Sequence, residues 1–132
     1  MNVTGVVLFY RGNENDATKA FKKAMQADPK NIDSYLNLGA LQCHQNHYNI
    51  AIATLQKGLA LEPRSIKLTY CLGWAYLLKG ESQNAINCLK SVIASDSSYI
   101  DAYNRLGDIY FENGEYNQAL AQYRTAIKFA HS

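Results

Sequence analysis

The residues most suited to binding a metal lie between positions 43 and 47, where Cys43, His44 and His47 are side chains of the types that hold zinc. Their spacing argues against a site, because Cys43 and His44 are adjacent and diverge on a helix, while His47 falls in a predicted turn. No second cluster in the sequence completes a tetrahedral set of ligands. We therefore expect no metal site.

Other catalytic patterns are missing as well. No serine, histidine and carboxylate spacing fits a nucleophilic triad, and no glycine-rich phosphate loop occurs. We therefore expect that the chain is not an enzyme and uses no cofactor. The chemistry that remains is that of recognition, which depends on how side chains are arranged on a folded surface.

Charge and composition narrow the class of partner. The formal net charge is +2, from 13 basic and 11 acidic residues, so neither nucleic acid nor a membrane surface is an expected partner. No apolar run approaches the roughly 20 residues of a membrane helix, and the N-terminal run VTGVVLFY lacks the basic start of a signal peptide. An odd number of cysteines without paired spacing favours a reducing, cytoplasmic location. They are Cys43, Cys71 and Cys88.

Several residue types recur every 34 positions without an insertion, which is the mark of a tandem array. The glycine set is Gly5, Gly39, Gly73 and Gly107. The alanine set is Ala17, Ala51, Ala85 and Ala119. Four residues after each alanine stand Phe21, Leu55, Leu89 and Tyr123. We expect one domain over 1–132, made of units at about 1–31, 32–65, 66–99 and 100–132.

Each unit contains two helical patterns, with apolar residues at three- and four-residue steps. Residues that tolerate a left-handed backbone separate the two, at Gly12, Asn46, Gly80 and Gly114. Pro29 and Pro63 follow second helices and end them. The predicted helices are 2–11, 15–27, 31–44, 48–61, 65–79, 82–95, 99–112 and 116–130. One hairpin cannot bury its own apolar face, so the units must stack.

The repeated glycines have a packing explanation. A glycine inside a helix costs about 1 kcal/mol relative to alanine, so its recurrence needs a compensating contact. We expect each glycine to lie where the two helices of a hairpin approach closely, with the repeated alanine opposite. The larger residues four positions after that alanine would fill the space on either side.

These motifs resemble the tetratricopeptide repeat family, whose pattern is an aromatic residue, Leu-Gly, Tyr, Ala, Phe and a terminal Pro. The fourth unit carries Tyr103, Leu106, Gly107, Tyr110, Ala119 and Tyr123. Gln42 and Thr69 depart from the pattern at two of its aromatic positions. The resemblance implies an all-α fold, a right-handed superhelical solenoid of four units and eight helices. It also implies that the first helices line a concave groove that receives a partner peptide.

The resemblance places the groove residues three before, one after and four after each glycine, on one helical face. We expect partner contacts from these positions and their polar neighbours, namely Leu36, Asn37, Ala40, Lys67, Tyr70, Trp74, Leu77, Asp101, Asn104, Arg105 and Asp108. The same rule also selects Asn2, Val6, Phe9, Cys43 and Phe111. Trp74 has two interpretations that the sequence leaves open, an anchor for a partner or a residue that fills space between first helices.

The leading functional hypothesis is an adaptor that holds a protein or peptide segment in this groove. Leu36, Ala40 and Cys71 stand where the family's carboxylate clamp needs polar residues, and only Arg105 matches it. An apolar or mixed peptide is therefore expected. The alternative is a self-assembling scaffold, a homo-oligomer formed through uncapped terminal helices.

Overall fold

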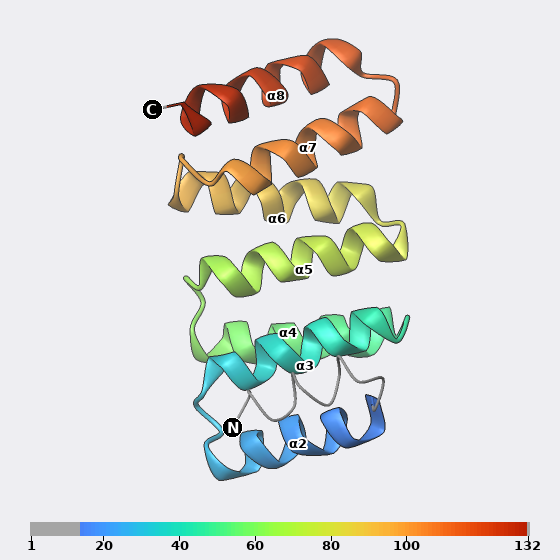
Figure 1. Ribbon diagram of the computed structural model, residues 1–132, viewed down its shortest axis with the longest axis vertical. Helices are drawn as coiled ribbons and strands as arrows, with labels where there is room; N and C mark the ends of the chain where they lie inside the picture. The colour runs from blue at the N-terminus through green and yellow to red at the C-terminus, as the bar shows by residue number, and fades with distance from the viewer. Residues whose placement is uncertain (1–13, 132) are drawn as a thin grey trace.

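The computed structural model describes residues 14–131, and these residues form seven α-helices and no strand. Figure 1 shows them as a single stack, with α2 at one end and α8 at the other. The helices are α2 (Glu14–Ala27), α3 (Ile32–His44), α4 (Tyr48–Leu61), α5 (Ile66–Lys79), α6 (Ser82–Ser95), α7 (Ile100–Glu112) and α8 (Tyr116–Ala130).

All seven helices match the predicted ranges to within one residue at each end. The first predicted helix, residues 2–11, lies outside the described residues. Gly5, Gly12, Asn2, Val6 and Phe9 lie outside them as well. The chain is therefore an all-helical array with seven described helices, and the expected number of eight is not established.

Helices that follow one another in sequence pack side by side and antiparallel (Figure 1). The hairpins are α3 with α4, α5 with α6, and α7 with α8, and α3 also contacts α5. Contacts between helices distant in sequence are few, as in repeat proteins that are built in one dimension. The apolar core accordingly forms three clusters that succeed one another along the stack.

Local backbone chemistry ends the first helix of each described hairpin. Asn46, Gly80 and Gly114 have φ angles of 65°, 93° and 79°, the left-handed conformation that the sequence predicts at these turns. Two helix starts are capped by side chains: the Asn31 carboxamide oxygen accepts from the Asp33 amide, and the Ser65 hydroxyl oxygen accepts from the Leu68 amide.

The three repeated glycines in the described part of the chain, Gly39, Gly73 and Gly107, lie where the hairpin helices meet. A Cβ atom added to Gly39 would stand 2.6 Å from Cδ2 of Leu55, and one added to Gly107 would stand 2.6 Å from Cε1 of Tyr123. Leu55 and Tyr123 thus lie directly over Gly39 and Gly107, and do not flank them as the sequence analysis expected. At Gly73 the nearest atom is Cβ of Cys88, at 3.0 Å.

The four repeated alanines are buried, with exposed fractions of 0% for Ala17, Ala51 and Ala85 and 2% for Ala119. A further close approach, which the repeat pattern does not predict, occurs at Gly58 in α4. A Cβ atom there would meet Cβ of Tyr35 at 3.0 Å and Cδ1 of Leu68 at 3.1 Å. Small residues thus let the helices approach both within a hairpin and between hairpins.

Candidate partner-binding groove

A narrow crevice between α5 and α7 gathers four of the groove candidates. Tyr70, Trp74, Leu77 and Arg105 line it together with Gly73 and with Leu89 of α6. The three large residues of α5 are four and three positions apart, so they share one face of the helix. The crevice is too narrow to hold a water molecule, so the side chains that line it form a closely packed surface.

Tyr70 links α5 to α7 at two places. Its hydroxyl oxygen accepts a hydrogen bond from Nε of Arg105 at 3.2 Å, and its ring lies 5.3 Å from the ring of Tyr99. The hydrogen bond to Tyr70 raises the pKa of the Arg105 guanidinium above its ordinary value, so the cation persists at all ordinary pH values. This hydrogen bond engages Nε of Arg105 and does not involve the two terminal nitrogens, which carry the other four N–H groups of the guanidinium.

Trp74 is half-buried and has contacts on two sides. Its ring packs against the core cluster formed by α3, α4 and α5, and it also lines the crevice. These contacts agree with the interpretation of Trp74 as a residue that fills space between helices, and its role as an anchor for a partner stays a prediction. A side chain anchored in this way presents a rigid apolar edge at low conformational cost.

Asp108 is held from within its own hairpin. Its Oδ1 accepts a hydrogen bond from the hydroxyl of Tyr123 at 2.6 Å, and this bond raises the pKa of Tyr123 to about 12. The carboxylate of Asp108 is otherwise exposed. Asp108 therefore adds negative charge to the face of α7 but does not line the crevice.

The remaining candidates lie apart from the crevice. Ala40, Lys67, Asp101 and Asn104 are exposed, and Leu36 and Asn37 are half-buried. Leu36 packs against the same core cluster as Trp74.

Two positions selected by the spacing rule depart from the expected pattern. Cys43 was expected on the groove, and that expectation is wrong, because its side chain is only 2% exposed and belongs to the core. Phe111 is 56% exposed and pairs edge-on with Tyr116, at a ring separation of 5.2 Å.

Two residues of this surface were not among the sequence candidates. Leu89 reaches the crevice from a second helix, opposite Gly73, and the repeated glycine was the signal that could have placed it there. Tyr99 precedes α7 and contacts Tyr70 across the hairpins. Nothing in its local sequence distinguishes it from other aromatic residues.

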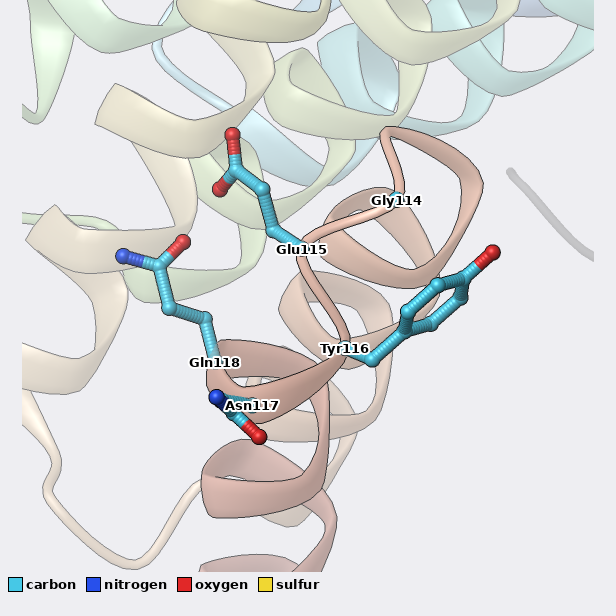
Figure 2. Close-up of a pocket in the computed structure, with 5 residues that line it drawn as sticks. All are labelled: Gly114, Glu115, Tyr116, Asn117 and Gln118. Carbon is cyan, nitrogen blue, oxygen red and sulfur yellow. The ribbon is translucent and has the colours of Figure 1, made fainter.

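An open depression at the turn between α7 and α8 is formed by five consecutive residues, Gly114–Gln118. Figure 2 shows Glu115 and Gln118 extending to one side of this turn, whereas Tyr116 extends to the other. A similar depression lies at the start of α7, around Asp96, Ser98 and Asp101. Neither brings together side chains from separate elements, so neither competes with the crevice as a binding site.

The described residues contain no cluster of three or more side chains suited to a metal. The three cysteines are free thiols, and burial raises the pKa of Cys43 and of Cys71 to about 11. Among the described helices, none has both the length and the apolar character needed to cross a membrane.

Comparison with known proteins matches the chain to repeat proteins. Sequence models described as tetratricopeptide repeat match residues 8–70 and 100–132, and one described as TPR repeat matches residues 75–114. The crystal structure of MamA is similar in both sequence and fold. It is 34% identical, with a TM-score of 0.81, over 95% of this chain and 73% of that one.

Two curated relatives match over a small part of their own length. The peroxisomal targeting signal receptor of Komagataella phaffii is 32% identical over 91 residues, which is 69% of this chain and 16% of the receptor. The mouse protein O-mannosyl-transferase TMTC1 is 25% identical over 92% of this chain and 13% of its own. The shared part in each case is a minor segment of a much longer protein.

Proposed function

The chain belongs to the tetratricopeptide repeat family, and from this premise we propose that it is a protein-binding module that holds a partner segment against its first helices. The crevice that joins Tyr70, Trp74, Leu77 and Arg105 is the observation that carries the proposal. It combines apolar and aromatic surface with one fixed cation. Tyrosine, tryptophan and arginine are the residue types that dominate interface energetics.

The proposed ligand is an apolar or mixed peptide segment. Apolar side chains of the segment would lie on Trp74 and Leu77, which are already supported by the core. The free donors of Arg105 would bind a backbone carbonyl or a carboxylate of the same segment. Because Tyr70 holds Arg105 at Nε, little side-chain freedom is lost when the partner binds.

The outer members of the predicted surface would contribute at its rim. Lys67, Asp101 and Asn104 are exposed polar residues of α5 and α7, and Leu36, Asn37 and Ala40 extend the surface along α3. Rim charges mainly affect the rate and specificity of association, and less the affinity itself. Asp101 and Asp108 add negative charge beside Arg105, which favours segments of mixed charge over strongly acidic ones.

The proposed role is non-catalytic and independent of a cofactor. The name of the peroxisomal targeting signal receptor says that that protein recognises a targeting signal, which supports a segment-binding role for an array of this kind. The match to TMTC1 gives no support for transfer chemistry in this chain, because the match covers only 13% of that enzyme.

The test is capture of partners by the purified chain and by its Trp74→Ala variant, with Tyr48→Ala as the control. Tyr48 is also half-buried, but it lies at the start of α4, away from the crevice. We expect Trp74→Ala to lose a bound partner that wild type and Tyr48→Ala retain. Equal capture by all three would contradict the groove assignment. A change only in oligomeric size would instead favour a self-assembling scaffold.

A further inference from the structure

The two signs of charge are separated between the two kinds of helix in this array. The second helices of the units are α2, α4, α6 and α8, which alternate with the first helices along the stack (Figure 1). Seven of the 13 basic residues lie on second helices, whereas nine of the 11 acidic residues lie outside them. α4, α6 and α8 contain no aspartate or glutamate. The small net charge of the whole chain therefore conceals an uneven distribution.

The cations of the second helices lie on one side of each helix. They stand two, five, six or nine residues after the repeated alanine, at spacings that share a helical face. At about 100° per residue, this face is opposite the alanine, which is buried. We call these positions on the four second helices the basic face. Its cations are Lys19, Lys22, Lys23, Lys57, Lys90, Arg124 and Lys128, and all of their side chains are exposed.

One row of the basic face crosses the whole array. Lys22, Lys90 and Arg124 hold the same repeat position, and the remaining member of that row is the neutral Gln56. Lys57 is adjacent to Gln56 and supplies the cation of α4. Because the units repeat with one step, residues that hold the same repeat position lie on the same side of the stack. Every second helix therefore contributes a cation to one surface.

The exposure of the basic face does not depend on where the sequence stops. α4 contacts α3 and α5, and α6 contacts α5 and α7. Lys57 and Lys90 are exposed on these two helices although a complete hairpin follows each of them. The following hairpin thus leaves the basic face open. Arg124 is exposed on α8 as its counterpart Lys90 is on α6, so its exposure needs no chain end.

Carboxylates do not neutralise this face. Lysines on an exposed helix are usually balanced by acidic residues three or four positions away, and α4, α6 and α8 offer none. The ion pair between Lys79 and Glu81 lies at the end of α5. Within the described residues, no cation of the basic face forms an ion pair. The face therefore presents a field of one sign to the solvent.

The neutral positions of the face restrict the class of anion that it fits. They hold small or amide side chains, namely Gln26, Ala53, Gln56, Ala60, Asn87, Ser91, Ala94, Ala121 and Thr125. The face thus has no aromatic ring on which a nucleic-acid base could stack. It also has no large apolar side chain that could enter the headgroup region of a bilayer. This composition favours a ligand that is bound through its charge alone.

Acidic residues at the ends of the second helices favour a narrow ligand. Glu81 precedes α6, Asp96 follows it, and Glu115 precedes α8. A duplex or a bilayer is wide enough to reach these carboxylates, which would repel it. Exposed charges are screened over roughly 8 Å at physiological ionic strength, so a single extended polypeptide along the middle of the face responds mainly to its cations.

We propose that the basic face binds an acidic, unstructured polypeptide segment with runs of consecutive aspartates or glutamates. No two acidic residues are adjacent in residues 1–132, so neither these residues nor a second copy of them offers such a run. The basic face lies on the second helices, whereas the proposed groove lies on the first helices. The proposal goes beyond the groove function, and either site can fail without the other.

The probe is a fluorescent peptide of about ten glutamates, which extends to roughly 30 Å and so reaches across neighbouring helices about 10 Å apart. We expect saturable binding to the purified chain, measured by fluorescence anisotropy. Binding should weaken as the salt concentration rises from about 0.05 M to about 0.5 M, because exposed charges are screened. A peptide of the same length made of glutamines should not bind.

The deciding variant is Lys90→Glu with Arg124→Glu, which reverses two cations of one row and should weaken binding at least about tenfold. The matched control is Lys30→Glu with Arg64→Glu, which changes the net charge equally. Lys30 and Arg64 are exposed and share a repeat position, but they lie in the turns after α2 and α4. This control should weaken binding by no more than about threefold.

A second pair of changes removes the charge without reversing it. Lys90→Gln with Arg124→Gln should weaken binding of the glutamate peptide by a smaller factor than the two glutamates do, because no repulsion is added. Circular dichroism verifies that each variant remains folded. Sedimentation of the chain without peptide should be the same for wild type and for Lys90→Glu with Arg124→Glu.

The proposal is overturned if the glutamate peptide does not bind, or if the deciding variant and its control weaken binding equally, because net charge alone would then explain the result. Tighter binding of phosphatidylserine vesicles or of a single-stranded oligonucleotide than of the peptide would also overturn it. Self-association that Lys90→Glu with Arg124→Glu abolishes would make a second copy the occupant, which contradicts the proposal as well.

Discussion

The hydroxyl of Tyr123 in α8 donates a hydrogen bond to Asp108 in α7 at 2.6 Å, and its ring crosses directly over Gly107. Leu55 and Leu89 hold the same repeat position as Tyr123, and neither has a hydroxyl that could reach across the hairpin. In the hairpin of α7 and α8, Tyr123 therefore stands where the two preceding hairpins have a leucine. It adds a hydrogen bond to Asp108, which lies on the predicted groove side of α7. Only a residue without a side chain at position 107 leaves room for it.

Gly107→Ala should destabilise the fold by about 1–3 kcal/mol, because the new Cβ would lie 2.6 Å from the Tyr123 ring and must displace it. Gly73→Ala is the control, since its nearest neighbour is 3.0 Å away and the higher helix propensity of alanine, about 1 kcal/mol, offsets the crowding. Urea unfolding of both variants measures the difference. Equal stability of the two variants would contradict the packing explanation.

Tyr123 should ionise at a higher pH than a free tyrosine side chain, because its bond to the Asp108 carboxylate raises its pKa from 10.0 to about 12. A raised folded-state pKa means that this bond contributes its full stabilisation below pH 10 and loses it as the pH rises through 12. Asp108→Asn should return the pKa of Tyr123 toward 10. Absorbance titration, with Tyr123→Phe to identify the signal, measures the shift.

The thiols of Cys43 and Cys71 should react slowly with alkylating reagents at pH 8. Burial raises both pKa values from 9.0 to about 11, which lowers the thiolate fraction roughly a hundredfold. The same shift makes stability fall as the pH rises from 9 toward 11, because the folded state holds the thiol protons more tightly. The measurement is the rate at which each thiol reacts with a disulfide reagent, first in buffer, where the protein is folded, and then in urea, where it is unfolded. Fast reaction of all three cysteines in buffer would show that these thiols are not protected.

Ser34→Ala should stabilise the protein by about 1 kcal/mol. The hydroxyl of Ser34 is fully buried and makes no hydrogen bond in the described part of the chain, while Ala102 occupies the same position two repeats later. Ser65→Ala is the control, because the Ser65 hydroxyl caps α5 and its loss should cost about 1 kcal/mol. The midpoint temperature of thermal unfolding should therefore rise for Ser34→Ala and fall for Ser65→Ala.

Local sequence determined most of the described helices. The 34-residue period, the apolar steps within it and the glycines or asparagine that end first helices act over one or two turns, so they specify helix bounds without knowledge of the neighbours. The same residues indicate how a hairpin closes, because a repeated glycine must face something large. Even there, the sequence did not reveal that Leu55 and Tyr123 sit over the glycine itself.

The lining of the crevice was predictable only in part. The helical spacing grouped Tyr70, Trp74 and Leu77, which line the crevice together, but the same spacing also selected Cys43, and Cys43 is buried. Whether a side chain at a given register is exposed depends on how far the next hairpin covers it. That coverage follows from contacts between helices, and no single helix encodes it.

The sequence by itself determined that this protein is a stack of helical hairpins and which residues are small at each crossing, because those properties follow from local backbone preferences and a repeated pattern. Tertiary structure decided that Arg105 meets Tyr70, that Leu89 joins the crevice, and that Cys43 is buried. These outcomes depend on the distance and rotation between neighbouring helices. Side-chain packing across at least two hairpins sets both quantities.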